Sequence, residues 1–322
     1  MNNFLYQVQQ IEELISNKKL AEIKKDYKEV SLKYRGEKIN SAAVVSSDKQ
    51  AIGYITSRMP ETSVIIDAVL NKTNSLIDLK KEVSSVLDLG SGTGSALWAL
   101  ENYVNKINVC AVEREPEMVK YSQKLSKDLD LNITYIQEDV LSKKVKDLLE
   151  TDLVLESFML NEMNDQDRRQ TLDLMVQKAK KYIILIEPGT PASYKKMMEN
   201  RDYLLSKKLN LVLPCMHSEK CALKDDYCNF TVRVNRTKIL KQVKDGSLGY
   251  EDEKYFYLVF SKKDFPKTKN AMVIRKPLYR KSCVDLKLCT SNKEIKNVTI
   301  TKKDKQKYAQ SKDLKQGDMF EF

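Results

Sequence analysis

The stretch Val86-Leu87-Asp88-Leu89-Gly90-Ser91-Gly92-Thr93-Gly94 decides the fold of this chain. An apolar run, which predicts a buried strand, leads into Asp88, and glycine then recurs at every second position. Glycine permits a tight turn and lets the backbone approach a ligand closely. A dinucleotide site would favour the spacing G-x-G-x-x-G, whereas the spacing here is D-x-G-x-G-x-G.

The sequence around this loop alternates between two patterns. Short β-branched runs are separated by helix-like segments, which predicts a parallel doubly wound sheet. Thr190 and Pro191 predict the N-cap and first turn of a helix. The segment KYFYLVFSK (254–262) predicts a closing strand of the same sheet. The other predicted strands are SSVLDLG, INVCAVERE, ITYIQEDV, DLVLESFML and KYIILIEPG.

The flanking regions have different patterns. Apolar residues at helical spacing in 4–30 and 51–70 predict N-terminal helices, with a break at Pro60. Three short β-like runs, AMVIRKPLYR, SCVDLKLCT and KNVTITK, follow the closing strand. We therefore predict an N-terminal helical region (1–80), a Rossmann-like domain (81–262) with a cysteine insertion at about 213–230, and a basic β-rich subdomain (263–322).

The glycine loop resembles motif I of class I S-adenosylmethionine (SAM)-dependent methyltransferases, and acidic residues downstream agree with that resemblance. Glu113 ends the second predicted strand, where a carboxylate can accept hydrogen bonds from both ribose hydroxyls. Asp139 ends the third, a usual place for contact with the adenine amino group, and Glu156 on the fourth faces the same sheet edge. The expected cofactor-binding residues are Asp88, Gly90, Ser91, Gly92, Gly94, Glu113, Asp139 and Glu156.

Signals for methyl transfer itself are missing from the sequence. An Asn/Asp-Pro-Pro-aromatic motif would mark an exocyclic-amine methyltransferase, but the chain has ESFMLNEMN after the fourth strand. A cytosine-C5 enzyme needs a nucleophilic cysteine near that strand, and none is there. Asn161 and Glu162 lie where a general base might be sought, yet no catalytic residue is identified. SAM binding is better supported than methyl transfer.

Three cysteines fall close together in PCMHSEKCALKDDYCNF, as Cys215, Cys221 and Cys228. Thiolates this dense predict a metal site. Zinc sites usually have paired short spacings, whereas iron–sulfur clusters tolerate irregular ones and commonly need four thiolates. Cys289 is the better candidate for the fourth ligand and Cys283 the fallback. The runner-up is a zinc site that His217 completes. Cys110 lies in the second predicted strand and is expected to be a core residue.

Charge is concentrated at one end of the chain. The net charge is +11, and residues 262–322 contribute +10 of it, from 17 Lys/Arg and 7 Asp/Glu. Such a basic segment suits a polyanion such as RNA or an anionic membrane surface, and its concentration in one segment favours nucleic acid. The start of the sequence has neither an apolar signal core nor an acid-free transit pattern, and no apolar run could span a bilayer. These features predict a cytoplasmic protein, not bound to a membrane and monomeric when free.

Together the motifs resemble the methyltransferase-like family associated with the small ribosomal subunit, found in mitochondria and in bacteria. The matching stretches are SRMPET, LDLGSGTGSALWA, LIEPGTPASYKKMMENR, PCMHSEKC, DYCNFTVRVNR and YEDEKYFYLVFS. The resemblance implies a SAM-binding core, a four-cysteine [4Fe-4S] cluster and binding to small-subunit rRNA during ribosome assembly. Carried over by motif, the cluster ligands are Cys215, Cys221, Cys228 and Cys289. Ala222 and Tyr227-Cys228-Asn229 depart from the family pattern, but the thiols are kept.

The expected fold is therefore α/β, a class I SAM-dependent methyltransferase with N-terminal helices and a small basic β subdomain. The expected function is assembly of the small ribosomal subunit through rRNA binding. Two alternatives stay open: an active SAM-dependent rRNA methyltransferase, and a non-RNA methyltransferase with a structural zinc.

Overall fold

The computed structural model describes residues 3–35, 45, 47–236, 238–266 and 269–322. The chain folds as two compact units: residues 1–180 with 232–253, and residues 181–231 with 254–322. The domain boundaries expected near residues 80 and 262 stay a prediction. In the described part of the chain, no helix has the length and apolar character needed to cross a membrane.

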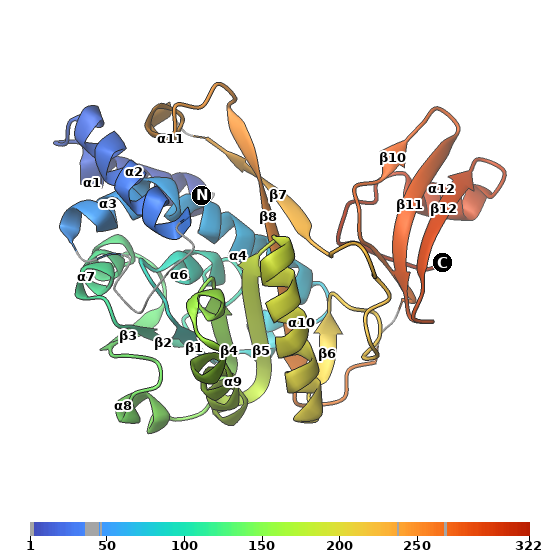
Figure 1. Cartoon of the computed structure of the whole chain (residues 1–322), viewed down its shortest axis with the longest axis horizontal. Coiled ribbons are helices and arrows are strands. Elements are labelled where there is room, and N and C mark those ends of the chain that lie inside the picture. The colour runs from blue at the N-terminus through green and yellow to red at the C-terminus, as the bar shows by residue number, and fades with distance from the viewer. Residues whose placement is uncertain (1–2, 36–44, 46, 237, 267–268) are drawn as a thin grey trace. The chain divides into compact units, whose positions relative to one another are not determined.

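The first unit contains a parallel sheet with the strand order β3-β2-β1-β4 (Figure 1). The strands are β1 (Ser85–Leu89), β2 (Asn108–Glu113), β3 (Asn132–Gln137) and β4 (Thr151–Ser157). Strand β1 pairs with a neighbour on each side, so that Leu87 lies opposite both Cys110 and Val154. Central strands of a parallel sheet have nearly continuous apolar sequences because both faces of the sheet are covered. The four strands predicted here are confirmed.

The connections in this unit are short helices. They are α6 (Ser95–Leu100), α7 (Pro116–Leu125), α8 (Lys143–Lys146), the 3₁₀ turn η1 (Leu160–Glu162) and α9 (Asp165–Lys178). The chain turns from β1 towards β2 and β3, and β4 lies on the other side of β1. In open α/β sheets, ligands bind outside the carboxyl ends of the strands at such a reversal of strand order.

The N-terminal helices confirm the prediction from helical spacing. They are α1 (Asn3–Ile15), α2 (Leu20–Arg35), α3 (Asp48–Ser57), α4 (Met59–Asn74) and the short α5 (Leu79–Glu82). Helix α3 ends at Arg58 and α4 begins at once, with Pro60 in its first turn. Proline is tolerated there because the N–H it lacks would have no helical partner. The break at this motif therefore separates two helices.

Residues 232–253 return to the first unit as an arm that includes α11 (Lys238–Val243). The buried Lys244 ammonium pairs with Glu61, at the start of α4, and with Glu251, 2.8 Å away. Arg236 also binds Glu251 at 2.8 Å, and Arg58 binds Glu61 at 3.2 Å. This chain of alternating charges fixes the arm to the break between α3 and α4. Breaking one member of a buried ionic network leaves its partner uncompensated.

The second unit contains three strands in the order β5-β8-β6, all antiparallel neighbours. They are β5 (Ala179–Pro188), β8 (Tyr250–Ser261) and β6 (Asn210–Leu213), and β7 (Phe230–Asn235) pairs with β8. Helix α10 (Pro191–Ser206) starts after Thr190, whose hydroxyl accepts a hydrogen bond from the Ser193 amide. The predicted N-cap is confirmed.

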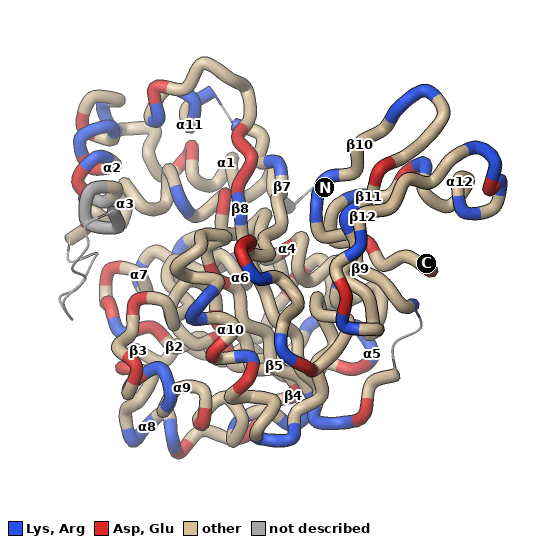
Figure 2. The backbone as a smooth tube through the Cα atoms, turned by 45° about the vertical axis from the view of Figure 1, so that its right-hand side comes forward, with Lys and Arg blue, Asp and Glu red and all other residues tan. Residues whose placement is uncertain are grey.

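A second, five-stranded antiparallel sheet completes this unit. It comprises β9 (Ala271–Val273), β10 (Leu278–Tyr279), β11 (Cys283–Thr290), β12 (Ile295–Thr301) and β13 (Met319–Phe320), with α12 (Lys305–Ser311). Its core contains Val273, Leu286, Leu288, Ile300 and Phe320. In Figure 2, lysine and arginine lie in the segments on either side of β10, between β12 and α12, and on α12. The predicted short strands of the basic segment are confirmed.

The close approach of α2 to α3 generates a first prediction. A Cβ atom at Gly53 would lie 2.7 Å from the carbonyl carbon of Asp26, a backbone atom that cannot rotate away. We expect Gly53→Ala to lower the free energy of unfolding by about 1–2 kcal/mol, although alanine is the better helix former. Denaturant unfolding measures this change.

The control is Gly249→Ala, because no atom lies within 4 Å of a Cβ placed there. Equal stability of the Gly53 and Gly249 variants would show that α2 and α3 are not packed as described.

Candidate functional site

The glycine loop after β1 has a conformation that requires glycine. Gly90, Gly92 and Gly94 have φ values of 71°, 54° and 86°, in the left-handed region. A Cβ at Gly90 would lie 2.6 Å from the Met159 sulfur, and one at Gly94 would lie 2.5 Å from the Ser122 hydroxyl. A Cβ at Gly92 would meet nothing within 4 Å. Gly92 therefore presents bare backbone to an open space.

That space is a pocket of about 120 Å³ in the first unit. It lies where β1, β2 and β4 end, which is the place expected for a ligand in this kind of sheet. Its walls combine carboxylates, one arginine and apolar side chains. The lining residues are Val45, Tyr54, Gly90, Gly92, Glu113, Arg114, Glu115, Met118, Ser157, Phe158, Met159 and Glu162.

Glu113, at the end of β2, is bonded to the loop that it faces. One carboxylate oxygen accepts a hydrogen bond from the Gly92 amide and the other from the Glu115 amide, both at 2.9 Å. Burial raises the pKa of Glu113, and these backbone donors oppose the rise. Each oxygen has a second lone pair, so the carboxylate can still accept bonds from two adjacent hydroxyls of a ligand.

Asp88 lies under the loop and has no exposed surface. Neither of its carboxylate oxygens has a hydrogen-bond partner in the described protein. Burial, with a smaller contribution from Glu113, raises the pKa of Asp88 to about 7. Buried carboxylates are normally paired, so an unpaired one beside a pocket fits a site completed by a cationic or hydrogen-bonding ligand.

The structure separates the predicted cofactor residues into three groups. Gly90, Gly92 and Glu113 line the pocket. Asp139 is exposed after β3, where its carboxylate accepts a bond from the Leu141 amide at 2.8 Å, and it is not among the lining residues. The others are buried beside the loop or on β4, namely Asp88, Ser91, Gly94 and Glu156.

The pocket also contains Glu162, which the sequence placed only in the region expected for a general base, and residues that the sequence did not point to. Burial raises the pKa of Glu162 to about 7, with Arg114 opposing the rise and Glu113 adding to it. Phe158 has a φ of 61°, an uncommon backbone conformation for a bulky side chain. Arg114 and Phe158 directly follow β2 and β4, and Glu162 lies in η1 after β4, so their position after a strand was a usable signal. Tyr54 comes from α3, and no sequence signal places it near the loop.

The second unit brings four cysteines together. Cys215 follows β6, Cys221 lies in the next loop, Cys228 precedes β7 and Cys289 lies on β11. None of them is in a disulfide. All four line one pocket, whose other walls are Tyr194, Met198, Pro214, Leu223, Phe230, Phe256, Ile274 and Ile295.

The other sequence candidates lie elsewhere. Cys283 is also on β11, but it is not among the residues that line this pocket, and neither is His217. Cys110 lies on β2 in the first unit, half buried. The structure therefore gathers the predicted set Cys215, Cys221, Cys228 and Cys289, which is named the thiol cluster from here on.

The sulfurs of the thiol cluster influence one another. Burial raises the pKa of the Cys228 thiol well above its usual value, and Cys215, Cys289 and Cys221 add to the rise while Arg275 opposes it. In the described chain, no three cysteine sulfurs lie within 4.8 Å of one another. The thiols share a site but are spread across it.

Side chains from α10 hold the loop that carries Cys215 and Cys221. The Arg201 guanidinium is almost completely buried and donates hydrogen bonds to the His217 carbonyl at 2.9 Å and the Glu219 carbonyl at 2.8 Å. A planar guanidinium can bind two carbonyls at fixed angles. The loop conformation thus depends on one side chain from a neighbouring helix.

The end of the loop near Cys228 is attached to the five-stranded sheet. Asp226 binds Arg275 at 2.7 Å and Lys287 at 2.9 Å. These two cations, chiefly Lys287 through its hydrogen bond, lower the pKa of Asp226. Arg275 also donates to the Tyr227 carbonyl at 2.8 Å, so this contact joins the backbone next to Cys228 to the sheet that carries Cys289.

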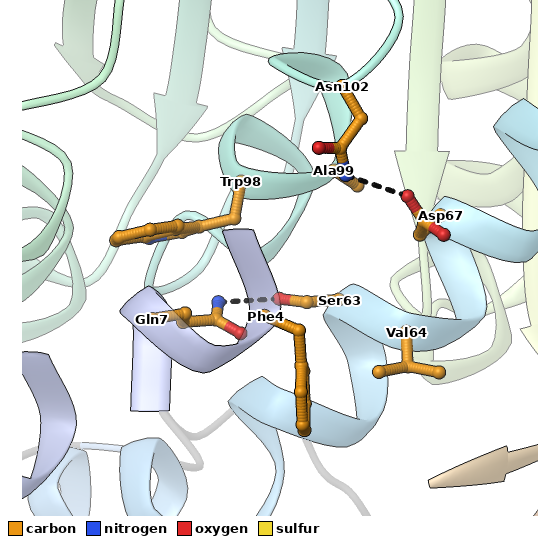
Figure 3. A pocket seen from close by; sticks show the side chains of 8 residues that line it. All are labelled: Phe4, Gln7, Ser63, Val64, Asp67, Trp98, Ala99 and Asn102. Atoms are coloured by element: carbon orange, nitrogen blue, oxygen red, sulfur yellow. Dashed lines mark hydrogen bonds between the residues drawn. The ribbon is translucent and has the colours of Figure 1, made fainter. Parts of the chain in front are cut away.

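A separate cavity of about 70 Å³ lies between α1, α4 and α6 (Figure 3). Two hydrogen-bonded pairs of side chains lie along its walls. The Gln7 amide donates to the Ser63 hydroxyl at 2.7 Å, and the Asn102 amide donates to the Asp67 carboxylate at 2.8 Å. Trp98 also lines it, and its indole nitrogen is buried without a partner. None of the predicted site residues lines this cavity.

The chain resembles several solved methyltransferase structures. A putative RNA methyltransferase from Pyrococcus horikoshii is 14% identical, with a TM-score of 0.42, over 64% of this chain and 86% of that one. A SAM-dependent methyltransferase from Aquifex aeolicus is 15% identical, with a TM-score of 0.42, over 67% and 99%. Magnesium protoporphyrin IX methyltransferase from Synechocystis, with bound SAM, is 12% identical, with a TM-score of 0.41, over 74% and 90%.

The prediction of an α/β fold is confirmed: the protein has a mostly parallel sheet whose strands alternate with helices. Residues 48–321 match the model of the family described as mitochondrial small ribosomal subunit Rsm22, and the chain belongs to that family. The human mitochondrial ribosome assembly protein METTL17 is 27% identical over 163 residues, 46% of this chain. The match spans only 36% of that human protein.

The buried Asp88 generates a second prediction. The ordinary pKa of an aspartate carboxyl group, taken here for the unfolded chain, is 3.8, and the pKa of Asp88 in the folded protein is about 7. The folded state therefore binds the proton more tightly than the unfolded state does. Without ligand, the free energy of unfolding therefore falls as the pH rises from about 4 to 7. We expect Asp88→Asn to reduce this fall, by up to about 1.4 kcal/mol per pH unit.

Thermal or denaturant unfolding of both proteins across this pH range measures the difference. Glu150→Gln, at an exposed position, is the control. A pH dependence unchanged by Asp88→Asn would mean that this carboxyl group is not buried as described.

Proposed function

We propose that this chain is an assembly factor of the small ribosomal subunit that binds rRNA and contains a SAM-binding core and a four-cysteine iron–sulfur cluster. The observation that carries the proposal is the thiol cluster, which unites a loop after β6 with a strand of the basic five-stranded sheet in one compact unit. Family membership and the printed name of the human relative support the ribosomal role.

The donor set suits an iron–sulfur cluster better than a single zinc ion. Four thiolates at about 2.3 Å from one tetrahedral zinc would lie about 3.8 Å from each other. The sulfurs here are spread more widely than that, which fits a [4Fe-4S] cluster held by four cysteines. Cys215, Cys221, Cys228 and Cys289 would hold it. When bound, the cluster would supply four further bonds between the loop and the sheet, and so contribute to folding.

The pocket in the first unit would hold SAM. Gly92 leaves room for backbone contact, Glu113 can accept hydrogen bonds from ribose hydroxyls, and the unpaired Asp88 lies below. SAM carries a sulfonium and an ammonium charge, both favoured near carboxylates. The proposed role of this ligand is structural.

The basic sheet would contact rRNA. Its exposed lysines include Lys302 and Lys303, which follow β12, and Lys305, at the start of α12. Lysines bind phosphates without regard to sequence, and they favour association by releasing counterions from RNA. The proposal includes a bacterial-type cytoplasmic location, a monomeric free chain and the three-part domain division given by the sequence.

Active methylation of rRNA is the second candidate, and Glu162 is the observation that favours it. This carboxyl group lines the pocket and has a pKa of about 7, a value suited to a general base at neutral pH. Transfer of labelled methyl groups from SAM to small-subunit rRNA, lost in Asp88→Ala, would establish this candidate over the non-catalytic one.

The cluster proposal predicts a metal content. Protein purified without oxygen is expected to be brown and to contain iron and sulfide in near-equal amounts. Cys228→Ser removes a buried ligand and is expected to lose most of both, whereas Cys110→Ser and Cys283→Ser are expected to retain them. Chemical analysis of iron, sulfide and zinc measures this.

Stoichiometric zinc without sulfide would overturn the iron–sulfur proposal. Loss of the cluster in Cys283→Ser but not in Cys289→Ser would show that the fourth ligand is Cys283 and not Cys289.

The rRNA proposal predicts a salt dependence. The affinity for small-subunit rRNA is expected to fall steeply with salt, and the slope of log affinity against log salt is expected to decrease by about 1 for each phosphate-binding lysine removed. The test variant is Lys302→Ala with Lys303→Ala.

The control is Lys143→Ala with Lys144→Ala, which removes the same charge from exposed positions on α8. If log affinity falls with log salt by the same slope in the two double variants, the basic sheet is not part of the rRNA interface.

A further inference from the structure

The Tyr194 side chain reaches one sulfur of the thiol cluster. Its hydroxyl donates a hydrogen bond to the Cys221 sulfur over 3.2 Å, and Tyr194 lines the same pocket as the four cysteines. The two residues are 27 positions apart, so the contact depends on how α10 packs against the loop. For a sulfur acceptor, this distance is short enough for a well-formed hydrogen bond.

Other aromatic side chains fix the ring of Tyr194. Phe256 on β8 packs edge-to-face with it, with the ring centroids 5.3 Å apart, and Tyr227 lies tilted at 6.3 Å. The helix that carries Tyr194 begins at the Thr190 cap, and Arg201 on the same helix holds the loop around Cys221. The donor and its acceptor are therefore both held in place before any ligand is bound.

A hydroxyl donor has a definite effect on a thiolate that binds iron. It withdraws electron density from the sulfur and stabilises the more negative state of the cluster, so hydrogen bonds to sulfur are among the determinants of the potential. It also disfavours departure or oxidation of the ligand, because the sulfur lone pair is engaged.

We propose that Tyr194 is a positioning residue of the thiol cluster, whose hydroxyl holds the Cys221 thiolate and makes a bound iron–sulfur cluster easier to reduce and slower to decay in air. The inference rests on the proposed cluster and deepens it. It assigns a role to α10, in the matched stretch LIEPGTPASYKKMMENR, that does not involve metal ligation.

The test variant is Tyr194→Phe in the full chain, because phenylalanine keeps the ring and removes only the hydroxyl. Loaded without oxygen, it is expected to contain iron and sulfide as the unmodified protein does. In a redox titration followed by electron paramagnetic resonance, the equilibrium constant for reduction is expected to fall about tenfold. Absorbance of the cluster is expected to bleach several-fold faster in air.

Tyr203→Phe is the matched control, since Tyr203 lies on the same helix and does not line the thiol pocket. If Tyr194→Phe and Tyr203→Phe have the same potential and the same bleaching rate, the inference is wrong. Absence of iron and sulfide from the unmodified protein would instead refute the proposed cluster, so the two failures are distinguishable.

Discussion

The pairing of β1 with strands on both sides is the constraint on which the first unit depends. It forces the residues of β1 into the centre of the sheet, so that Asp88 is completely buried at its carboxyl end. The chain turns directly after this strand, and glycine accommodates the left-handed conformations found at Gly90, Gly92 and Gly94 with the least strain. Burial raises the pKa of the Asp88 carboxyl, whose oxygens have no hydrogen-bond partner in the described part of the chain. The architecture of the sheet and the chemistry of the pocket therefore have the same origin.

In the second unit, the corresponding constraint is a loop without regular structure that must present three thiols at fixed positions. A loop alone could not do this, because ordering it costs conformational entropy that few local contacts offset. The structure supplies external supports: Arg201 binds two loop carbonyls, and Asp226 joins the end of the loop to Arg275 and Lys287. These supports hold the loop against the rest of the second unit through the chain's own contacts, and a metal bound by the thiol cluster would add to them.

The sequence was sufficient for most strands and for the helix start at Thr190, because period and capping are local properties. It did not predict β6, β7 or β13. It was also sufficient to propose Cys289, since cysteine is rare and chemically specific. It could not place Tyr54, Tyr194 or Arg201, because ordinary aromatic and charged residues on helices reach their sites only through long-range packing. Asp139 shows the opposite limitation. The rule that acids at strand ends contact a ligand selected it, yet it follows β3, at the edge of the sheet, and is exposed.

The two units differ in a way that bears on function. The pocket of the first unit has features suited to SAM, but the residues after β4 lack the motifs that act on a nucleobase. The thiol cluster shares its pocket with apolar and aromatic side chains such as Phe230, Phe256 and Ile274, surroundings that would shield a bound metal group from water. Selection for catalysis would shape a site for the methyl acceptor, whereas selection for a stable binding surface would shape supports, internal cross-links and exposed positive charge. The second unit has such supports and exposed positive charge, and this contrast is the physical reason for preferring the proposed assembly role.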